Sequence, residues 1–201
     1  MKVEKLILGK IDNNTYIVSN NGKCVIVDPS DGFLEIMEAV KKSGAVVEAI
    51  LITHAHWDHV FSLNQIKAAT GAPIYMHQDD QSLLTRSMTR IGESVPEIDV
   101  LVKGGESFEV IDMDCRVLHT PGHAKGCVCY LMGDAMFCGD TLFRNSIGRT
   151  DLSTSNPTAM EQTIVMLAQI KEDYTLYPGH GDESTLQYEI ENNPYFIQAR
   201  G

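Results

Sequence analysis

The sequence has little of what defines membrane and secreted proteins. No stretch approaches the roughly 20 consecutive apolar residues that cross a bilayer. The first ten residues contain one short apolar block, Leu6-Ile7-Leu8, which is far shorter than the apolar region of a secretory signal peptide. We therefore expect a cytoplasmic protein that has no membrane partner.

Positive charge is also scarce. The 201 residues include 16 Lys and Arg against 27 Asp and Glu, which leaves a formal net charge of -11. Binding to a phosphate backbone depends mainly on cationic side chains that displace counterions. The charge balance therefore argues against a nucleic-acid partner.

Cysteines are few and odd in number. All five, at positions 24, 115, 127, 129 and 138, occur in or beside apolar segments, which is typical of buried free thiols. Cys127 and Cys129 could form half of a zinc site. Their two-residue spacing in an alternating segment instead predicts that both lie on one face of a strand and pack there.

What the chain does contain is enough apolar sequence for a core: 43% of the residues are hydrophobic. We expect a single domain over residues 1–201. Apolar runs predict strands at 15–19, 24–28, 49–53, 73–76, 98–102, 107–111, 115–118, 127–132, 135–138 and 174–177. Apolar residues three and four apart predict helices at 33–40, 63–69, 79–85, 157–168 and 183–191. Mixed strands and helices indicate an α/β fold.

Four metal-type ligands crowd into six residues directly after the predicted strand 49–53. They are His54, His56, Asp58 and His59. Alternate side chains of an extended segment project to the same side, so the first two can meet at one point while the other two turn toward a second. Imidazole nitrogens and carboxylate oxygens are ligands for zinc and similar divalent cations, which predicts a metal site here.

Three further candidates each follow a predicted strand and lie beside a glycine: His123, Asp140 and His180. Each alone could belong to a simple turn. Loops at one edge of a sheet can meet across long separations in sequence, so these residues can join the first cluster. Together the candidates are five histidines and two aspartates, which is enough for two metal sites.

In these motifs the chain resembles the metallo-β-lactamase superfamily and, within it, the glyoxalase II-like hydrolases of the short single-domain bacterial type. The resemblance covers nearly the whole chain and rests on these segments in this order: Asp28-Pro29, His54-Ala55-His56-Trp57-Asp58-His59, His119-Thr120-Pro121-Gly122-His123, Gly139-Asp140-Thr141-Leu142-Phe143, Ser146-Ile147-Gly148-Arg149-Thr150-Asp151 and Pro178-Gly179-His180-Gly181. It implies a four-layer αββα sandwich.

The resemblance also implies roles for individual residues. It assigns one metal ion to His54, His56 and His123, a second to Asp58, His59 and His180, and a bridging position to Asp140. Asp28 is similar to a carboxylate that orients a ligand imidazole through its other N–H. His119 and His77 match no ligand position and are expected to be structural. The implied cofactor is two divalent metal ions, with zinc as the first candidate and iron or manganese as alternatives.

The implied activity is hydrolysis of a small-molecule hydroxyacyl thioester to a hydroxy acid and a thiol. Asp58 and Asp140 would act catalytically by positioning hydroxide, and Arg149, Lys125 and Arg144 are the basic candidates for holding the substrate. The chain lacks the C-terminal helical domain and the Lys-Phe-Tyr segment that grip glutathione in eukaryotic-type glyoxalase II, so the thiol half stays open. Two alternatives remain: a persulfide dioxygenase with one iron, and a metal-binding or redox-sensing module without turnover. The oligomeric state is not readable from the sequence.

Overall fold

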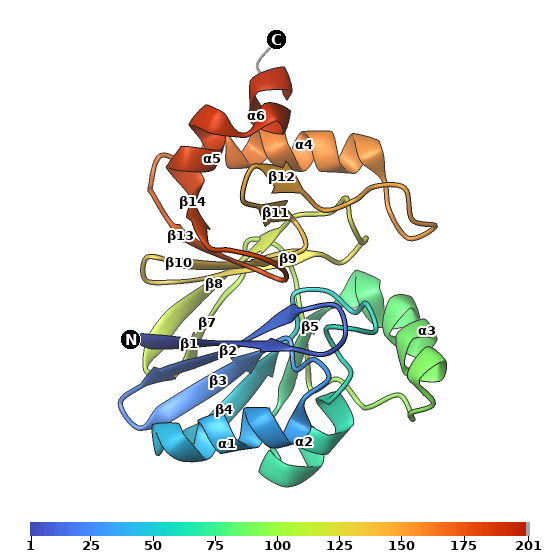
Figure 1. Ribbon diagram of the computed structural model, residues 1–201, viewed down its shortest axis with the longest axis vertical. Helices are drawn as coiled ribbons and strands as arrows, with labels where there is room; N and C mark the ends of the chain where they lie inside the picture. Colours follow the sequence, from blue (N-terminus) through green and yellow to red (C-terminus); the bar gives the residue numbers. More distant parts are fainter. Residues whose placement is uncertain (200–201) are drawn as a thin grey trace.

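The computed structural model describes residues 1–199, and its centre is a pair of six-stranded β-sheets packed against each other (Figure 1). The first sheet has its strands in chain order: β1 (Lys2–Leu8), β2 (Asn13–Asn20), β3 (Lys23–Val27), β4 (Val46–Leu51), β5 (Ile74–His77) and β6 (Val100–Val102). β1 to β3 are antiparallel, and β3 to β6 are parallel.

The second sheet comes from the other half of the chain. Its order is β14 (Ser184–Thr185), β13 (Thr175–Pro178), β10 (Ala135–Gly139), β9 (Val128–Met132), β8 (Met113–His119) and β7 (Ser107–Val110). Here β10 and β13 are parallel, while the other neighbours are antiparallel. A separate pair, β11 (Leu142–Phe143) and β12 (Ser146–Ile147), lies between the second sheet and the C-terminal helices (Figure 1).

Helices cover the outer face of each sheet. Those of the first half are α1 (Phe33–Ser43), α2 (Leu63–Thr70) and α3 (Gln81–Ile91), the last preceded by the 3-10 turn η1 (Gln78–Asp80). Those of the second half are α4 (Pro157–Leu167), α5 (Leu186–Asn192) and α6 (Pro194–Ala199). Three buried apolar clusters separate the layers, one between the sheets and one under each set of helices. This arrangement confirms the predicted αββα sandwich.

Local sequence explains several element boundaries. Asn21 and Gly22, with φ of 50° and 78°, form the tight turn between β2 and β3 that the Asn-Gly signal predicts. Gly44 ends α1 in the left-handed conformation, with φ of 68°. Asn156 caps α4 by accepting a hydrogen bond from the backbone N–H of Ala159.

Other boundaries differ from the prediction. Residues 2–8, for which the sequence predicts no strand, form β1 at the edge of the first sheet. Charged residues at an edge strand discourage pairing with other chains. They also interrupt the alternation of apolar residues by which a strand is predicted from sequence. The last predicted helix, 183–191, begins only at Leu186, because Thr185 still belongs to β14 and caps α5.

The prediction for the two neighbouring cysteines was also partly wrong. Cys127 and Cys129 are both buried, as expected, but they pack in different clusters. β9 begins only at Val128, so Cys127 lies in the preceding turn and faces the helices of the first half instead. Within residues 1–199, no helix has both the length and the apolar character needed to cross a membrane.

Candidate metal centre

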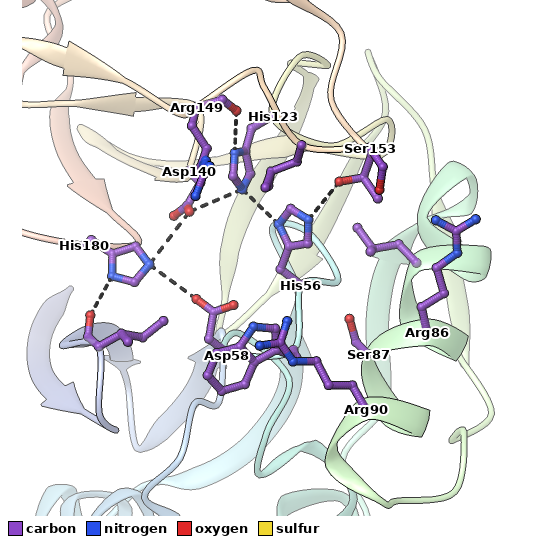
Figure 2. Close-up of a pocket in the computed structure, with 15 residues that line it drawn as sticks. His56, Asp58, Arg86, Ser87, Arg90, His123, Asp140, Arg149, Ser153 and His180 are labelled. Atoms are coloured by element: carbon purple, nitrogen blue, oxygen red, sulfur yellow. Dashed lines mark hydrogen bonds and ion pairs between the residues drawn. The ribbon is translucent and has the colours of Figure 1, made fainter.

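The candidate ligands lie on loops that leave both sheets at the same edge. The segment 54–59 follows β4, His123 lies between β8 and β9, Asp140 follows β10 and His180 follows β13. Because β10 and β13 run parallel, the loops after them open at the same edge of the second sheet. Figure 2 shows the side chains from these loops converging on one space.

The first cluster consists of His54, His56 and His123, each with a ring nitrogen within 4.8 Å of the others. Nδ1 of His56 lies 2.9 Å from Nε2 of His123. His54 is fully buried, and its Nε2 has no hydrogen-bond partner. Three imidazole nitrogens therefore face one point, in the grouping that the family resemblance implied.

The second cluster consists of Asp58, His59 and His180, again with ligand atoms within 4.8 Å of one another. Oδ2 of Asp58 lies 3.4 Å from Nε2 of each histidine. Nε2 of His59 is buried and makes no hydrogen bond. This grouping also matches the one that the resemblance implied.

Asp140 lies between the two clusters and faces both, and its Oδ2 also lies 3.7 Å from Nε2 of His180 in the second cluster. Its Oδ1 is 3.3 Å from Nε2 of His59, and its Oδ2 is 3.4 Å from Nε2 of His123. The carboxylate is buried, and Oδ1 has no hydrogen-bond donor. One side chain thus faces both groups of ligands.

Each of the five imidazoles is held from its outer side. A histidine that binds a metal through one nitrogen usually uses the other nitrogen for a hydrogen bond that fixes the ring. The outer contacts are His54 Nδ1 to Thr53 Oγ1 (3.3 Å), His56 Nε2 to Thr154 Oγ1 (3.1 Å), His59 Nδ1 to Asp28 Oδ2 (3.0 Å), His123 Nδ1 to the main-chain oxygen of Arg149 (2.9 Å) and His180 Nδ1 to the main-chain oxygen of Ile11 (3.2 Å). Asp28, which is expected to orient a ligand imidazole, contacts His59.

Several of these supporting groups could not be found in the sequence. Asn13 donates a hydrogen bond to Asp58 Oδ2 at 2.9 Å, and its amide nitrogen lies 3.4 Å from Nε2 of His180. Thr154 follows the motif at 146–151 and has no motif of its own. Main-chain oxygens, such as that of Arg149, carry no signal in the side-chain sequence at all.

The chemistry of the donors fits divalent cations. Buried polar atoms are normally paired, so the lone His54 Nε2, His59 Nε2 and Asp140 Oδ1 at one site indicate that another group completes them. Burial lowers the pKa of His54, and burial beside His123 lowers the pKa of His56 to about 4. Both rings are therefore neutral near pH 7, which is the form that binds a metal.

The two carboxyl groups, Asp58 and Asp140, are ionised near pH 7. Burial alone would raise the pKa of Asp58, but hydrogen bonds from His180 and Asn13 and the nearby His59 hold it well below its usual value. The pKa of Asp140 is likewise lowered by His59, His123 and His180 against the effect of burial. Against the effect of burial, Asp140 and Asp28 raise the pKa of His59, and Asp58 and Asp140 raise the pKa of His180. Two anionic carboxylates, with imidazoles that are neutral in the first cluster and lose a proton on metal binding in the second, form a donor set suited to two divalent cations.

A cavity of about 510 Å³ opens directly onto this centre (Figure 2). Its lining consists of metal-ligand candidates, a tryptophan, three arginines, and aliphatic and hydroxyl side chains: Ile11, His56, Trp57, Asp58, Leu83, Arg86, Ser87, Arg90, His123, Asp140, Arg149, Leu152, Ser153, Thr154 and His180. A smaller cavity of about 220 Å³ adjoins it and shares Ile11, Trp57 and Asp58. A substrate therefore has room on two sides of the centre.

The three basic residues expected to hold the substrate lie in different places. Arg149 lines the main cavity, but its guanidinium makes two hydrogen bonds to Asp151, at 2.7 and 2.8 Å. Lys125 lines a neighbouring cavity and is 3.5 Å from a carboxylate oxygen of Asp79. Arg144 is exposed and is not among the residues that line the main cavity, so its contact with a substrate stays a prediction.

Two other arginines of the main cavity are not predicted from the sequence. Arg86 and Arg90 lie one turn apart on α3, along one wall of the cavity (Figure 2). The predicted helix 79–85 stopped short of them. A spacing of four residues on a helix was the only signal in the sequence that they share a face.

The two remaining histidines form a separate pair. The rings of His77 and His119 stack at 4.2 Å, and Asp79 lies close enough to complete a third ligand group. His77 Nδ1 accepts the backbone N–H of Asp79, and His119 Nε2 donates to the main-chain oxygen of Lys125. These backbone contacts agree with the structural role expected for both histidines.

Comparison with known proteins places these observations in a family. The Metallo-beta-lactamase superfamily matches residues 8–180. The "Probable metallo-hydrolase YqgX" of Bacillus subtilis is 33% identical over 205 residues and covers 97% of each chain. The "Hydroxyacylglutathione hydrolase" of Photobacterium profundum is 29% identical, over 94% of this chain and 71% of its own length.

Solved structures agree with this comparison. The B3 metallo-beta-lactamase BLEG-1 superposes with a TM-score of 0.88 at 29% identity, covering 97% of this chain and 99% of its own. TTHA1623, in a di-iron-bound form, gives a TM-score of 0.82 at 31% identity over 96% and 100% of the two chains. With the αββα fold and the ligand clusters described above, these matches show that the chain belongs to the metallo-β-lactamase superfamily.

Proposed function

We propose that the protein is a hydrolase with two metal ions that cleaves an acyl thioester, in the manner expected of a glyoxalase II-like enzyme. The observation that carries the proposal is the position of Asp140, whose carboxylate oxygens lie 3.3 Å from His59 in one ligand cluster and 3.4 Å from His123 in the other. A chain adapted to a single ion would need only one of the two clusters. The names of two relatives, a probable metallo-hydrolase and a hydroxyacylglutathione hydrolase, point to the same class of reaction.

In this proposal each cluster holds one ion, with His54, His56 and His123 on one side and Asp58, His59 and His180 on the other. Two divalent cations, if bound by these residues, would supply hydroxide near neutral pH and polarise a carbonyl group. Asp58 and Asp140 are ionised and can only accept hydrogen bonds, so they orient the attacking water by accepting from its O–H. Zinc is the first candidate, and iron, which TTHA1623 binds, and manganese suit the same ligands.

The composition of the cavity favours a thioester among acyl substrates. Among the described residues that line it there is no lysine, tyrosine or cysteine, and its two carboxyl groups are ionised. The lining histidines, His56, His123 and His180, are assigned to the metal ions in this proposal, so the site is then poor in groups that could protonate a leaving group. A thiol with a pKa of about 8.5 leaves as its thiolate without such help, whereas an alkoxide or amine does not.

Hydrolysis of a β-lactam is the second candidate. It is favoured by the likeness to the B3 enzyme BLEG-1, with a TM-score of 0.88 and 29% identity over nearly all of both chains. A β-lactam is a strained amide whose leaving amine needs a proton, which the lining of the cavity supplies poorly. The thioester therefore remains the first candidate.

The test combines metal analysis with a substrate panel. Protein reconstituted with zinc, iron or manganese is measured for metal content and assayed with S-lactoyl thioesters, a chromogenic cephalosporin and glutathione persulfide. We expect two equivalents of metal per chain and turnover of a thioester in preference to the β-lactam and the persulfide. Oxygen-dependent persulfide turnover with one iron would support the dioxygenase instead, and two metals without any turnover would support a binding module.

The Asp140→Ala variant addresses the bridging role. We expect it to retain at most one equivalent of metal and to lose turnover by about 100-fold or more, because neither ion keeps its shared ligand. Asp134→Ala, at an exposed position in the turn between β9 and β10, is the matched control and should behave as the wild type. Unchanged metal content and turnover in Asp140→Ala would contradict the proposal.

A further inference from the structure

Asn13 and Asn14 begin β2 and lie against the loop that carries His180. Both residues are buried, with 2% and 1% of their surface exposed. Their backbones contact the loop directly: Asn13 forms an isolated β-bridge with His180, and the N–H of Asn14 donates to the main-chain oxygen of Gly179 at 2.7 Å. A strand of the first sheet therefore holds a ligand loop of the second sheet.

The side chain of Asn14 fixes the backbone of this loop. Its Nδ2 donates to the main-chain oxygens of Pro178 and Gly181, both at 2.9 Å, and so spans His180 from below and above in the sequence. The hydroxyl of Tyr16, on the same face of β2, donates to the main-chain oxygen of Pro178 at 2.7 Å. These contacts hold the loop but do not reach the ligand atoms.

The side chain of Asn13 does reach the ligand atoms. Its Nδ2 donates to Oδ2 of Asp58 at 2.9 Å and lies 3.4 Å from Nε2 of His180. Those two ligand atoms are themselves 3.4 Å apart (Figure 2). Asp58 follows β4 of the first sheet and His180 follows β13 of the second. One amide group is therefore in contact with two ligand candidates that come from different sheets.

The chemistry of the amide suits this place. Asp58 is ionised and can only accept, so the N–H side of the Asn13 amide must face it. A carboxylate oxygen has two lone pairs, so Oδ2 can accept this hydrogen bond and still bind a cation. A lysine or arginine could hold the same oxygen, but its positive charge would repel that cation. A neutral donor fixes the carboxylate without this repulsion.

From these contacts we infer that Asn13 is a positioning residue for the second ligand cluster: its amide holds the carboxylate of Asp58 in place beside His180. The inference rests on the two-ion site of the proposed function. It adds that one of the two ions depends on a neutral side chain that is not itself a ligand. Contacts that orient metal ligands are typically worth about 10-fold to 100-fold in metal affinity.

The first experiment follows zinc binding at each cluster separately. Zinc, buffered by a chelator, is added to the isotopically labelled wild type and to Asn13→Leu, and proton–nitrogen NMR spectra report the ring nitrogens of His54 and His180. We expect the variant to need about 10-fold to 100-fold more free zinc to shift the His180 signals. The His54 signals, which report the first cluster, should shift at the same concentration as in the wild type.

Two further variants separate positioning from packing. Asn13→Ala removes the amide without adding apolar atoms and should behave as Asn13→Leu does. Asn20→Leu is the matched control, because Asn20 ends the same strand and its Nδ2 donates to the main-chain oxygen of Ile111 at 2.9 Å, far from the ligands. It should keep the wild-type affinity at both clusters. An equal loss at both clusters in the Asn13 variants, no loss in them, or the same loss in Asn20→Leu would overturn the inference.

A measurement on the wild type does not depend on how the variants fold. The side-chain amide signals of Asn13 should shift at the same zinc concentration as the ring signals of His180. Their hydrogens should then exchange slowly with water, because the bond to Asp58 persists when zinc is bound. Amide signals that do not respond to zinc, or that exchange faster once it is bound, would show that Asn13 does not hold the carboxylate.

A thioester assay separates this inference from the proposed function. With an S-lactoyl thioester, Asn13→Leu should have a lower kcat at limiting zinc and recover as zinc is raised, with KM nearly unchanged. Selective loss of zinc at His180 in the variant, without turnover by the wild type, would leave the inference intact and contradict the proposed function. Turnover by the wild type, together with unchanged zinc binding by Asn13→Leu, would overturn the inference alone.

Discussion

The carboxylate of Asp80 connects the two loops that carry the first ligand cluster, because its Oδ1 accepts the backbone N–H of Gly126 at 2.7 Å. Its Oδ2 accepts the N–H of Ala55, which lies between His54 and His56, at 2.8 Å. Gly126 follows His123 by three residues. A single buried side chain therefore sets the distance between ligands that lie far apart in the sequence.

The first prediction concerns this connection. Asp80→Ala should lower the free energy of unfolding by about 3 kcal/mol, because it leaves two buried N–H groups without acceptors. It should also weaken metal binding. Chemical denaturation and competition with a metal chelator measure the two effects. Asp79→Ala, the neighbouring aspartate that makes neither contact, is the control, and equal effects in both variants would contradict the assignment.

Gly126→Ala tests the same connection from the other side. A Cβ at this position would lie 2.6 Å from Cγ of Asp80, which is too close for two carbon atoms that are not bonded. We expect the loop to shift and metal affinity to fall as in Asp80→Ala. If Gly126→Ala bound metal as tightly as the wild type, the hydrogen bond between Asp80 and Gly126 would not be needed to position the ligands.

The contact between Asp28 and His59 gives a second prediction. Asp28 also accepts the backbone N–H and the hydroxyl of Thr53, at 2.7 and 2.6 Å, so its carboxylate is held rigidly. Asp28→Asn should lower the affinity for one of the two metals by about 10-fold to 100-fold, because it disturbs the hydrogen bond that orients the His59 ring. Chelator competition measures this, with the exposed Asp114→Asn as control. Loss of both metals at once would show a wider structural role.

A third prediction uses the glycine beside His180. Gly179 has no left-handed φ, so alanine there is not strained, but its Cβ would overlap Oδ1 of Asp140 and Cε1 of His59. Gly179→Ala should therefore lose metal and turnover while the protein stays folded. Gly181→Ala is the contrasting variant. A Cβ at position 181 would meet no other atom, so the only cost is the left-handed φ of 74°. We expect this variant to lose about 1 kcal/mol of stability and to keep its metals.

The fourth prediction concerns the cysteines and the redox-sensing alternative. Burial raises the pKa of Cys24 and Cys129 to about 11 and of Cys115 to about 12, and it raises the pKa values of Cys127 and Cys138 well above the usual range. At pH 8, below all of these values, at most about one thiol in a thousand would be ionised. The native protein should therefore react negligibly with a disulfide reagent, while all five thiols should react in denaturant. Rapid reaction of one native thiol would revive the redox-sensing alternative.

The sequence by itself determined the types of ligand and the layers of the fold. His54, His56, Asp58 and His59 form a local motif that is visible because the residues are adjacent. The alternation of apolar residues along β9 places Val128, Tyr130 and Met132 between the sheets and Cys129 under the helices, as period-two patterning requires. Such patterns involve residues that are close together in the chain, so they can be recognised from the sequence alone.

Only the tertiary structure decided which distant groups meet. Asp80 lies on a short 3-10 turn with no motif, yet sheet packing brings it between two ligand loops. Arg86 and Arg90 line the cavity because α3 packs beside it, whereas Arg144, which is nearer to the motifs in sequence, does not line it. A side chain's position relative to a site depends on the packing of whole sheets and helices, and that information is spread over the chain rather than written in any one segment.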